Sequence, residues 1–138
     1  MRASLLAVAL LFAACDTGGT LSSPSPLAET RWVLVEFEGR TAEVESTLGF
    51  ESAGAFGGQA ACNTYSGIYA ALSGGAVGPR FSATVQSVTE AGCPGDLNAY
   101  EDVYLDALRS AMRWAVDGDR LMLTLADGAG EMVYARTE

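Results

Sequence analysis

Histidine and lysine are both absent from this chain of 138 residues. Without histidine the chain can form neither a Ser-His-Asp or Cys-His catalytic arrangement nor a zinc site with histidine ligands. Carboxylate or thiol chemistry is the remaining route to an enzyme, and no such pair stands at a spacing that supports it. Asp117 and Asp119 flank a single glycine without further ligands, which is typical of a turn. We therefore expect no enzymatic activity, no cofactor and no metal ion.

Basic residues are scarce as well. The chain has 8 arginines against 17 aspartates and glutamates, which gives a net charge of −9. Nucleic acids and anionic lipids are bound through basic patches, so this composition argues against both as partners. The acidic surface is interpreted as a source of solubility.

No apolar run is long enough to cross a bilayer as a helix, which takes roughly 20 residues. Arg2 is followed by a shorter apolar run, Leu5 to Ala14, and this order is typical of an export signal. Cys15 comes next, and the small residues before it resemble a bacterial lipobox, in which the cysteine is lipidated and becomes the first residue. Phe12 departs from that pattern, because Leu, Val or Ile is usual there. We expect residues 1–14 to be a lipoprotein signal peptide and Cys15 to anchor the protein to a membrane of the bacterial cell envelope.

Two alternatives to this anchor remain open. Cys15 is an ordinary residue if the signal is cleaved elsewhere, which would make the protein periplasmic or secreted, or the apolar run is an uncleaved anchor. Residues 15–28 are small, polar and proline-containing, which favours a flexible tether over folded structure. The remaining residues, 29–138, suffice for one domain.

Short strands and one helix are predicted for this domain. The strands are aromatic and β-branched runs bounded by turn residues: Thr30 to Phe37, Ser46 to Glu51, Tyr65 to Leu72, Arg80 to Ser82, Thr84 to Val88, Arg113 to Val116, Leu121 to Leu125 and Glu131 to Ala135. An amphipathic helix is predicted from about Asp96 to Arg113, because apolar residues recur there at spacings of three and four. Asp96 is its expected N-cap, and Arg109 and Arg113 are expected in its last turns.

The remaining cysteines, Cys62 and Cys93, are 31 residues apart in the sequence. In an exported protein such a pair is first interpreted as a structural disulfide. A redox-active pair is the alternative, because Cys93 lies just before the predicted helix and a helix N-terminus lowers the pKa of a thiol.

Several motifs occur in an order that resembles the META domain, the family of the HslJ heat-shock lipoprotein. The central one is Cys62-Asn63-x-Tyr65-Ser66-Gly67-x-Tyr69. The others are Trp32-x-Leu34, Leu48-x-Phe50, Thr89 four residues before Cys93, Glu101-x-x-Tyr104-Leu105-x-x-Leu108 and Asp117-Gly118-Asp119-x-Leu121-x-Leu123. Ala61 and Ala91 depart from the family pattern, which has glycine and often methionine there. The resemblance covers essentially all of residues 29–138.

The resemblance implies an α+β fold that is mostly antiparallel β, with a curved or barrel-like sheet and one amphipathic helix packed on it. It also implies that the two cysteines pair. Family members are envelope or secreted proteins associated with stress tolerance, and no enzymatic activity is established for the domain.

The central motif is interpreted as scaffold, with Asn63 capping a turn, Gly67 allowing positive φ or close packing, and Tyr65 and Tyr69 locking the turn to the sheet. Thr89 belongs to the same structural motif, and a recognition loop is the rival interpretation.

The function expected is that of a non-enzymatic envelope lipoprotein, related to stress or envelope integrity through binding another envelope component. The alternative is a carrier of a small apolar or amphipathic ligand in a barrel-like sheet. Its lining would come from aromatic residues and methionines: Phe50, Phe56, Phe81, Trp114, Met112 and Met122.

Overall fold

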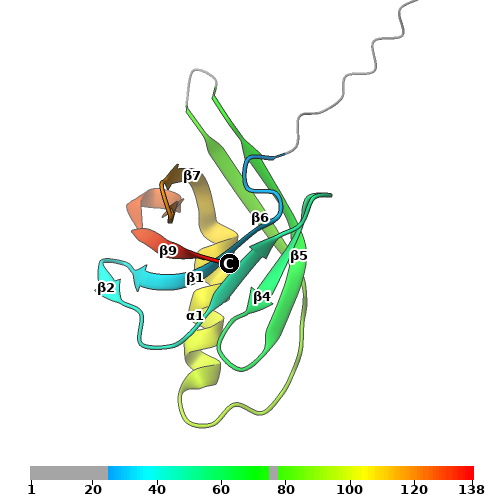
Figure 1. Ribbon diagram of the computed structural model, residues 1–138. Coiled ribbons are helices and arrows are strands. Elements are labelled where there is room, and N and C mark those ends of the chain that lie inside the picture. The colour runs from blue at the N-terminus through cyan, green and yellow to red at the C-terminus, as the bar shows by residue number, and fades with distance from the viewer. Residues whose placement is uncertain (1–24, 75–77) are drawn as a thin grey trace, which may run out of the picture.

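The computed structural model describes residues 25–74 and 78–138. Within these ranges the elements are β1 (Thr30–Phe37), β2 (Arg40–Thr41), β3 (Thr47–Phe50), β4 (Ala55–Gln59), β5 (Thr64–Leu72), β6 (Arg80–Val88), α1 (Leu97–Ser110), β7 (Ala111–Asp117), β8 (Arg120–Leu125), the 3-10 turn η1 (Ala126–Gly128) and β9 (Glu131–Thr137). Figure 1 shows that the strands wrap around a common interior, with α1 on one side.

The sheet closes on itself. Its neighbours follow the order β1, β3, β4, β5, β6, β7, β8 and β9, and β9 pairs with β1 through a register that includes Trp32↔Arg136 and Phe37↔Met132. All these pairings are antiparallel. The short strand β2 adds only a hairpin to the end of β1. The predicted mostly antiparallel, barrel-like sheet with one helix is therefore confirmed as a closed eight-stranded barrel.

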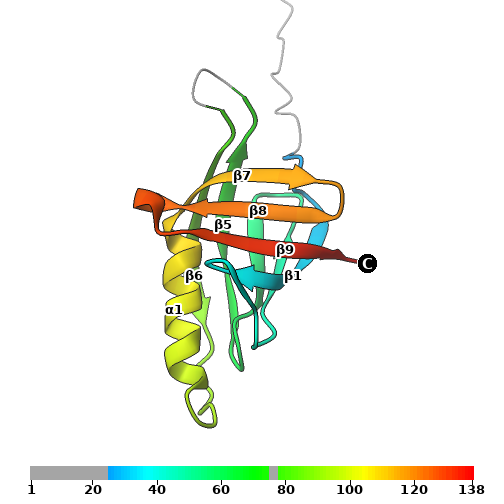
Figure 2. The ribbon, with the colours of Figure 1, turned by 90° about the vertical axis from the view of Figure 1, so that its left-hand side faces the viewer.

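The barrel is weakest between β6 and β7, where the recorded pairing is the single position Arg80↔Arg113. In Figure 2, β7, β8 and β9 run across β5 and β6, so the two halves of the sheet diverge from this point. Helix α1 lies alongside β6 in the same view and contacts both β6 and β8. The helix therefore covers the opening that the diverging strands leave.

Side chains fill the interior of the barrel. Alternation along the strands turns one face inward, as in β5, where Tyr65, Gly67 and Tyr69 are buried between exposed residues. Aromatic rings pack against one another there: the centroids of Phe50 and Tyr69 are 4.5 Å apart, and those of Phe50 and Phe81 are 6.1 Å apart. Close packing of this kind contributes stability beyond the area that is buried.

Three tyrosine hydroxyl groups form a chain through this core. The Tyr65 hydroxyl donates to the Thr47 carbonyl oxygen at 2.7 Å. The hydroxyl oxygens of Tyr65 and Tyr104 are 3.1 Å apart, and those of Tyr104 and Tyr134 are 3.2 Å apart. Each hydroxyl has one proton, and Tyr65 uses its own on Thr47. Tyr104 therefore donates to Tyr65. The hydroxyl of Tyr134 lies next to that of Tyr104 and also donates to Met132 Sδ at 3.8 Å, so the chain joins β9, α1, β5 and β3.

Most of the predicted strands are confirmed, and four details differ. Residues Arg80–Val88 form one strand instead of two, and β4 with its two glycines was not predicted as a strand. The helix ends at Ser110, so the prediction that Arg113 lies in its last turn is wrong. Ala111 pairs with Leu125 and Arg113 with Thr124, so sheet pairing overrides the helix propensity of this segment. Asp96 occupies the N-cap position, but its side chain makes no capping hydrogen bond.

The folded domain includes the last residues of the range expected as a tether. Leu27 is fully buried in the core, and its carbonyl oxygen accepts a hydrogen bond from the Thr30 hydroxyl at 2.6 Å. The predicted signal peptide, Cys15 and the rest of the tether lie outside the described residues. In the part of the chain that is described, no helix is both long enough and apolar enough to span a membrane.

The tyrosine chain predicts how stability depends on alkaline pH. Burial raises the pKa of Tyr65, Tyr104 and Tyr134 well above the ordinary value, and the neighbouring tyrosines contribute further. Above a pH of about 10 the unfolded chain loses protons that the folded protein keeps, so the unfolded state binds fewer protons. We expect the free energy of unfolding to decrease there by about 1.4 kcal/mol per pH unit for each of the three tyrosines.

Guanidinium unfolding between about pH 8 and pH 11 measures this slope, and the absence of lysine and histidine keeps other groups from obscuring it. The variant Tyr134→Phe removes one titrating group while Tyr104 keeps its hydrogen bond to Tyr65. We expect its slope to be smaller by about a third. A wild-type stability that does not change above pH 10 would contradict the described chain.

Candidate functional site

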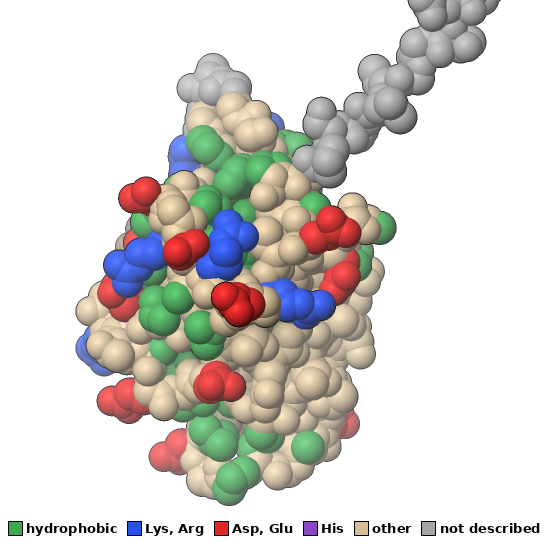
Figure 3. Space-filling view, viewed as in Figure 1, with side chains coloured by type: hydrophobic (Ala, Val, Ile, Leu, Met, Phe, Trp, Pro, Cys, Tyr) green, Lys and Arg blue, Asp and Glu red, His purple; other side chains and the backbone are tan. Residues whose placement is uncertain are grey.

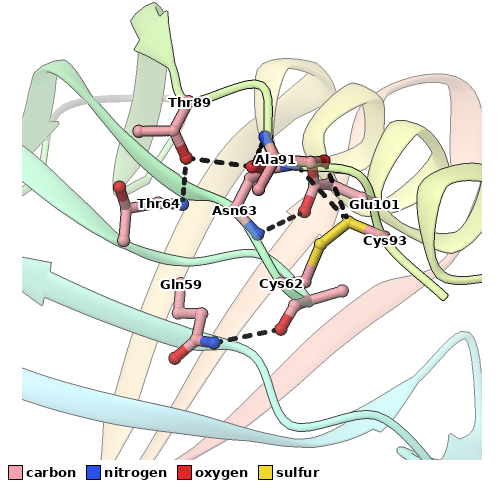
Figure 4. The surroundings of a disulfide bond; sticks show 9 residues. Gln59, Cys62, Asn63, Thr64, Thr89, Ala91, Cys93 and Glu101 are labelled. Carbon is pink, nitrogen blue, oxygen red and sulfur yellow. Dashed lines mark hydrogen bonds between the residues drawn. A yellow bond between two sulfur atoms is a disulfide. The ribbon is translucent and has the colours of Figure 1, made fainter.

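The central motif begins in the turn between β4 and β5, where Asn63 is buried with 4% of its surface exposed. Figure 4 shows its side chain between the segment that follows β6 and the Glu101 side chain on α1. Three parts of the chain that are distant in sequence therefore meet at this residue.

Asn63 holds the Glu101 carboxylate with two N–H groups. Its backbone N–H donates to Glu101 Oε2 at 3.0 Å, and its Nδ2 donates to Glu101 Oε1 at 2.7 Å. Glu101 is itself buried, with 5% of its surface exposed. Each carboxylate oxygen thus accepts a hydrogen bond, which offsets the cost of removing the charge from water.

The other side of the Asn63 amide holds the segment after β6. Its Oδ1 accepts from the Ala91 backbone N–H at 2.7 Å and from the Thr89 hydroxyl at 3.0 Å. Thr89 Oγ1 in turn accepts from the Thr64 backbone N–H at 3.0 Å. We call Asn63, Thr89, Ala91 and Glu101 the asparagine cluster. The cluster fastens the loop after β6 and the helix to the turn that starts β5.

Cys62 and Cys93 add a covalent link at the same place. The structure pairs them in a disulfide, with their Cα atoms 6.0 Å apart. Asn63 Nδ2 lies 3.5 Å from Cys93 Sγ, so the disulfide borders the asparagine cluster directly. This geometry fits the structural bridge that the sequence predicts.

This arrangement does not suit a metal ion, although three potential ligands lie close together here. The ligand atoms of Cys62, Cys93 and Glu101 lie within 4.8 Å of one another. Metal binding by cysteine needs the thiolate form, which a disulfide does not supply. Both Glu101 oxygens also accept hydrogen bonds from Asn63. The group is therefore interpreted as structural.

The remaining motif residues point into the barrel. Tyr65 and Tyr69 are buried, with Tyr65 in the hydroxyl chain and Tyr69 packed on Phe50. Gly67 serves close packing rather than positive φ, because a Cβ atom there would meet the Thr84 carbonyl oxygen at 1.9 Å. The structure brings Asn63 and Thr89 together as predicted sites, while Tyr65, Gly67 and Tyr69 follow them along β5.

Glu101 is the residue of this site whose role the sequence analysis missed. It lies three residues before Tyr104 and four before Leu105, and all three are buried on α1. A charged residue at the spacing of an apolar helix face signals a buried partner, because charges are rarely buried unless paired. That spacing was the available signal.

A family model for the META domain matches residues 25–138. The chain belongs to the META domain family. The match starts at Ser25, which agrees with the burial of Leu27 in the folded domain. The expected resemblance is thereby confirmed.

Solved structures share the fold of this META domain. A protein from Burkholderia xenovorans, known from its NMR structure, is 24% identical, with a TM-score of 0.63 over 99% of this chain and 97% of that one. A DUF4847 family protein from Bacteroides vulgatus is 15% identical, with a TM-score of 0.61 over 80% of this chain and 94% of its own. A further NMR structure is 21% identical, with a TM-score of 0.59 over 79% of this chain and 90% of that chain. A comparison with curated proteins finds no match.

Exchanging the amide of Asn63 and the carboxylate of Glu101 tests the hydrogen bonding of the asparagine cluster. The change Asn63→Asp sets a second carboxylate against Glu101, and we expect a loss of about 3 kcal/mol or more in the free energy of unfolding. The change Glu101→Gln sets one amide donor against another, with a loss of about 1–3 kcal/mol. The double variant restores a donor facing an acceptor, so it should be more stable than the sum of the two losses predicts.

Urea unfolding of the four proteins measures this coupling. Asn98→Asp, an amide-to-acid change on the exposed surface of α1, is the matched control and should alter stability little. Losses that simply add in the double variant would contradict the described cluster.

Reduction of the disulfide should weaken the domain without unfolding it. In the chain-entropy model, the link across 31 residues contributes about 3–4 kcal/mol. We expect a reductant, or Cys62→Ser combined with Cys93→Ser, to lower the free energy of unfolding by this amount while the asparagine cluster keeps the barrel folded. Denaturant unfolding with and without reductant measures the difference, and an unchanged midpoint would show that the bridge does not form.

Proposed function

We propose that this META domain is the folded part of a lipid-anchored envelope protein that acts by binding another envelope component. The META fold with its cysteine pair is the observation that carries the proposal, because disulfides persist in exported proteins and not in a reducing cytosol. Cys15, directly after an apolar signal-like run, supplies the anchor. A role in stress tolerance or envelope integrity is part of this proposal.

A non-enzymatic role is supported by how the polar groups are used. The amide and carboxylate atoms of the asparagine cluster form hydrogen bonds with one another, with the Thr89 hydroxyl and with the backbone. Within the described ranges, no buried side-chain nitrogen or oxygen lacks a hydrogen-bond partner. A catalytic site instead needs groups that are held ready for a substrate.

A ligand carrier is the weaker candidate because side chains occupy the barrel interior. Phe50, Phe56 and Phe81 pack into the core, and Met112 is 44% exposed on the outside. Trp114 and Met122 are only partly buried. The proposed lining residues therefore do not face one common cavity.

The mass of the protein isolated from its own membrane fraction tests the anchor. We expect a chain that starts at an acylated Cys15, and we expect Cys15→Ser to move the protein out of the membrane fraction. Thr17→Ala, in the proposed tether, is the matched control and should leave the protein with the membrane. An unlipidated mass, or a Cys15→Ser protein that stays with the membrane, would refute lipid anchoring.

A further inference from the structure

Exposed apolar side chains gather at one end of the barrel. Among the described residues, Leu72 at the end of β5 is 54% exposed, and Met112 and Val116 on β7 are 44% and 38% exposed. Trp114, between them on β7, is partly buried, and its Nε1 donates to the Leu72 carbonyl oxygen at 3.3 Å. We call Leu72, Met112, Trp114 and Val116 the end patch. The hydrogen bond joins Trp114 to Leu72, and Met112 and Val116 each lie two residues from Trp114 on β7.

Positive charge borders the end patch. Arg80 lies opposite Leu72 in the β5–β6 pairing and opposite Arg113 in the β6–β7 pairing. Leu72, Met112 and Arg80 line one hollow of about 320 Å³, which is mostly apolar. Across the rest of the described surface, Arg31, Arg109, Arg120 and Arg136 each form a salt bridge with an acidic neighbour. Arg80, like Arg40 on β2, is not in any of these bridges.

The folded chain begins at this same end. Both ribbon views place the first described residues beside β7 and the β5–β6 hairpin (Figures 1 and 2). Figure 3 shows hydrophobic side chains in the upper part of this face, and further hydrophobic side chains together with acidic ones over its middle and lower parts. The first described residues thus lie at the same end of the barrel as the end of β5 and the start of β6, where Leu72 and Arg80 pair.

The length of this segment fixes how far the domain can lie from an anchor at Cys15. Nine residues separate Cys15 from Ser25, so the two are at most about 35 Å apart. Such a tether keeps the local concentration of membrane surface high, and a weak contact then suffices to orient the domain.

The charge distribution favours one orientation. The chain carries a net charge of −9, so most of its surface is repelled by an anionic membrane. Arg80 is instead attracted to phosphate groups, and tryptophan favours the level of the lipid headgroups. The acidic surface argues against membrane binding by the free domain. Once an anchor holds the domain at the membrane, repulsion of the acidic faces therefore orients them away from the lipid.

We propose that the end patch docks on the phospholipid surface to which Cys15 is attached, a proposal that rests on the lipid anchor of the proposed function. Leu72, Met112 and Trp114 enter the headgroup layer, while Arg80 contacts phosphates. The contact is shallow, because β7 beyond Arg113 has no recorded pairing with β6 and its backbone groups need water or headgroup partners. The exposed face of helix α1 then remains accessible to a partner.

Fluorescence quenching in vesicles tests this docking. The full acylated protein is placed in vesicles of phosphatidylethanolamine and phosphatidylglycerol whose acyl chains carry bromine, which quenches nearby tryptophan. We expect quenching of wild-type emission and its loss in Trp114→Phe, because the remaining Trp32 is buried in the barrel with 1% exposed. Leu72→Ser with Met112→Ser should also lose the quenching while vesicle flotation shows that the protein stays anchored.

Val103→Ser is the matched control, since Val103 is exposed on α1 and lies outside the end patch. Its quenching should equal that of the wild type. A protein that floats with the vesicles without quenching overturns the docking and leaves the anchor intact. A third outcome is a dimer in which Trp114 is shielded from a soluble quencher but is not quenched by bromolipid. This outcome would assign the end patch to contact with a second copy and would also overturn the proposal.

Failure of the anchor gives a different result. A native protein without lipid at Cys15 refutes the proposed anchoring. Docking is then tested by coupling Cys15 to a maleimide phospholipid in the same vesicles. Quenching that is absent under this coupling overturns the docking independently.

Discussion

The hydrogen bonds between Asn63 and Glu101 hold together the part of the barrel that the sheet leaves open. β6 and β7 share one recorded pair, so strand pairing alone does little to close the fold there. Helix α1 covers the opening, and its buried carboxylate accepts two N–H groups of Asn63 from the turn before β5. The same asparagine holds the loop after β6 through Thr89 and Ala91. Because a buried carboxylate is costly without such partners, removing either residue leaves the other unsatisfied.

Polar groups elsewhere in the barrel follow the same rule. The hydroxyls of Tyr134, Tyr104 and Tyr65 pass hydrogen bonds through the core to the Thr47 carbonyl oxygen, so β9, α1, β5 and β3 are joined by a network. Networks that are fully satisfied make an interior rigid and specific. An interior of this kind has little room for a ligand.

Periodicity and turn chemistry in the sequence were sufficient for most elements but not for their closure. Leu121, Leu123 and Leu125 alternate as a strand should, and all three are buried. The strand Ala55–Gln59 was missed because two glycines read as a turn, whereas Gly58 is there to let the Thr47 backbone approach: a Cβ would meet its carbonyl oxygen at 2.0 Å. The role of Glu101 was missed because its partner, Asn63, is 38 residues away. Long-range contacts of this kind leave only an indirect mark on local sequence. Family resemblance supplied the barrel-like closure that periodicity could not.

Native-state hydrogen exchange in the Asn63→Ala variant tests most directly whether this contact fastens the helix over the opening. Our account predicts that the amides of α1 and of residues 89–93 lose protection, while those of β1 and β9, which close the barrel on the other side, keep theirs. The same experiment on Asn98→Ala, an exposed position of α1, should show no such change. Protection that falls equally in all strands and in the helix, or that does not change in α1, would contradict the account.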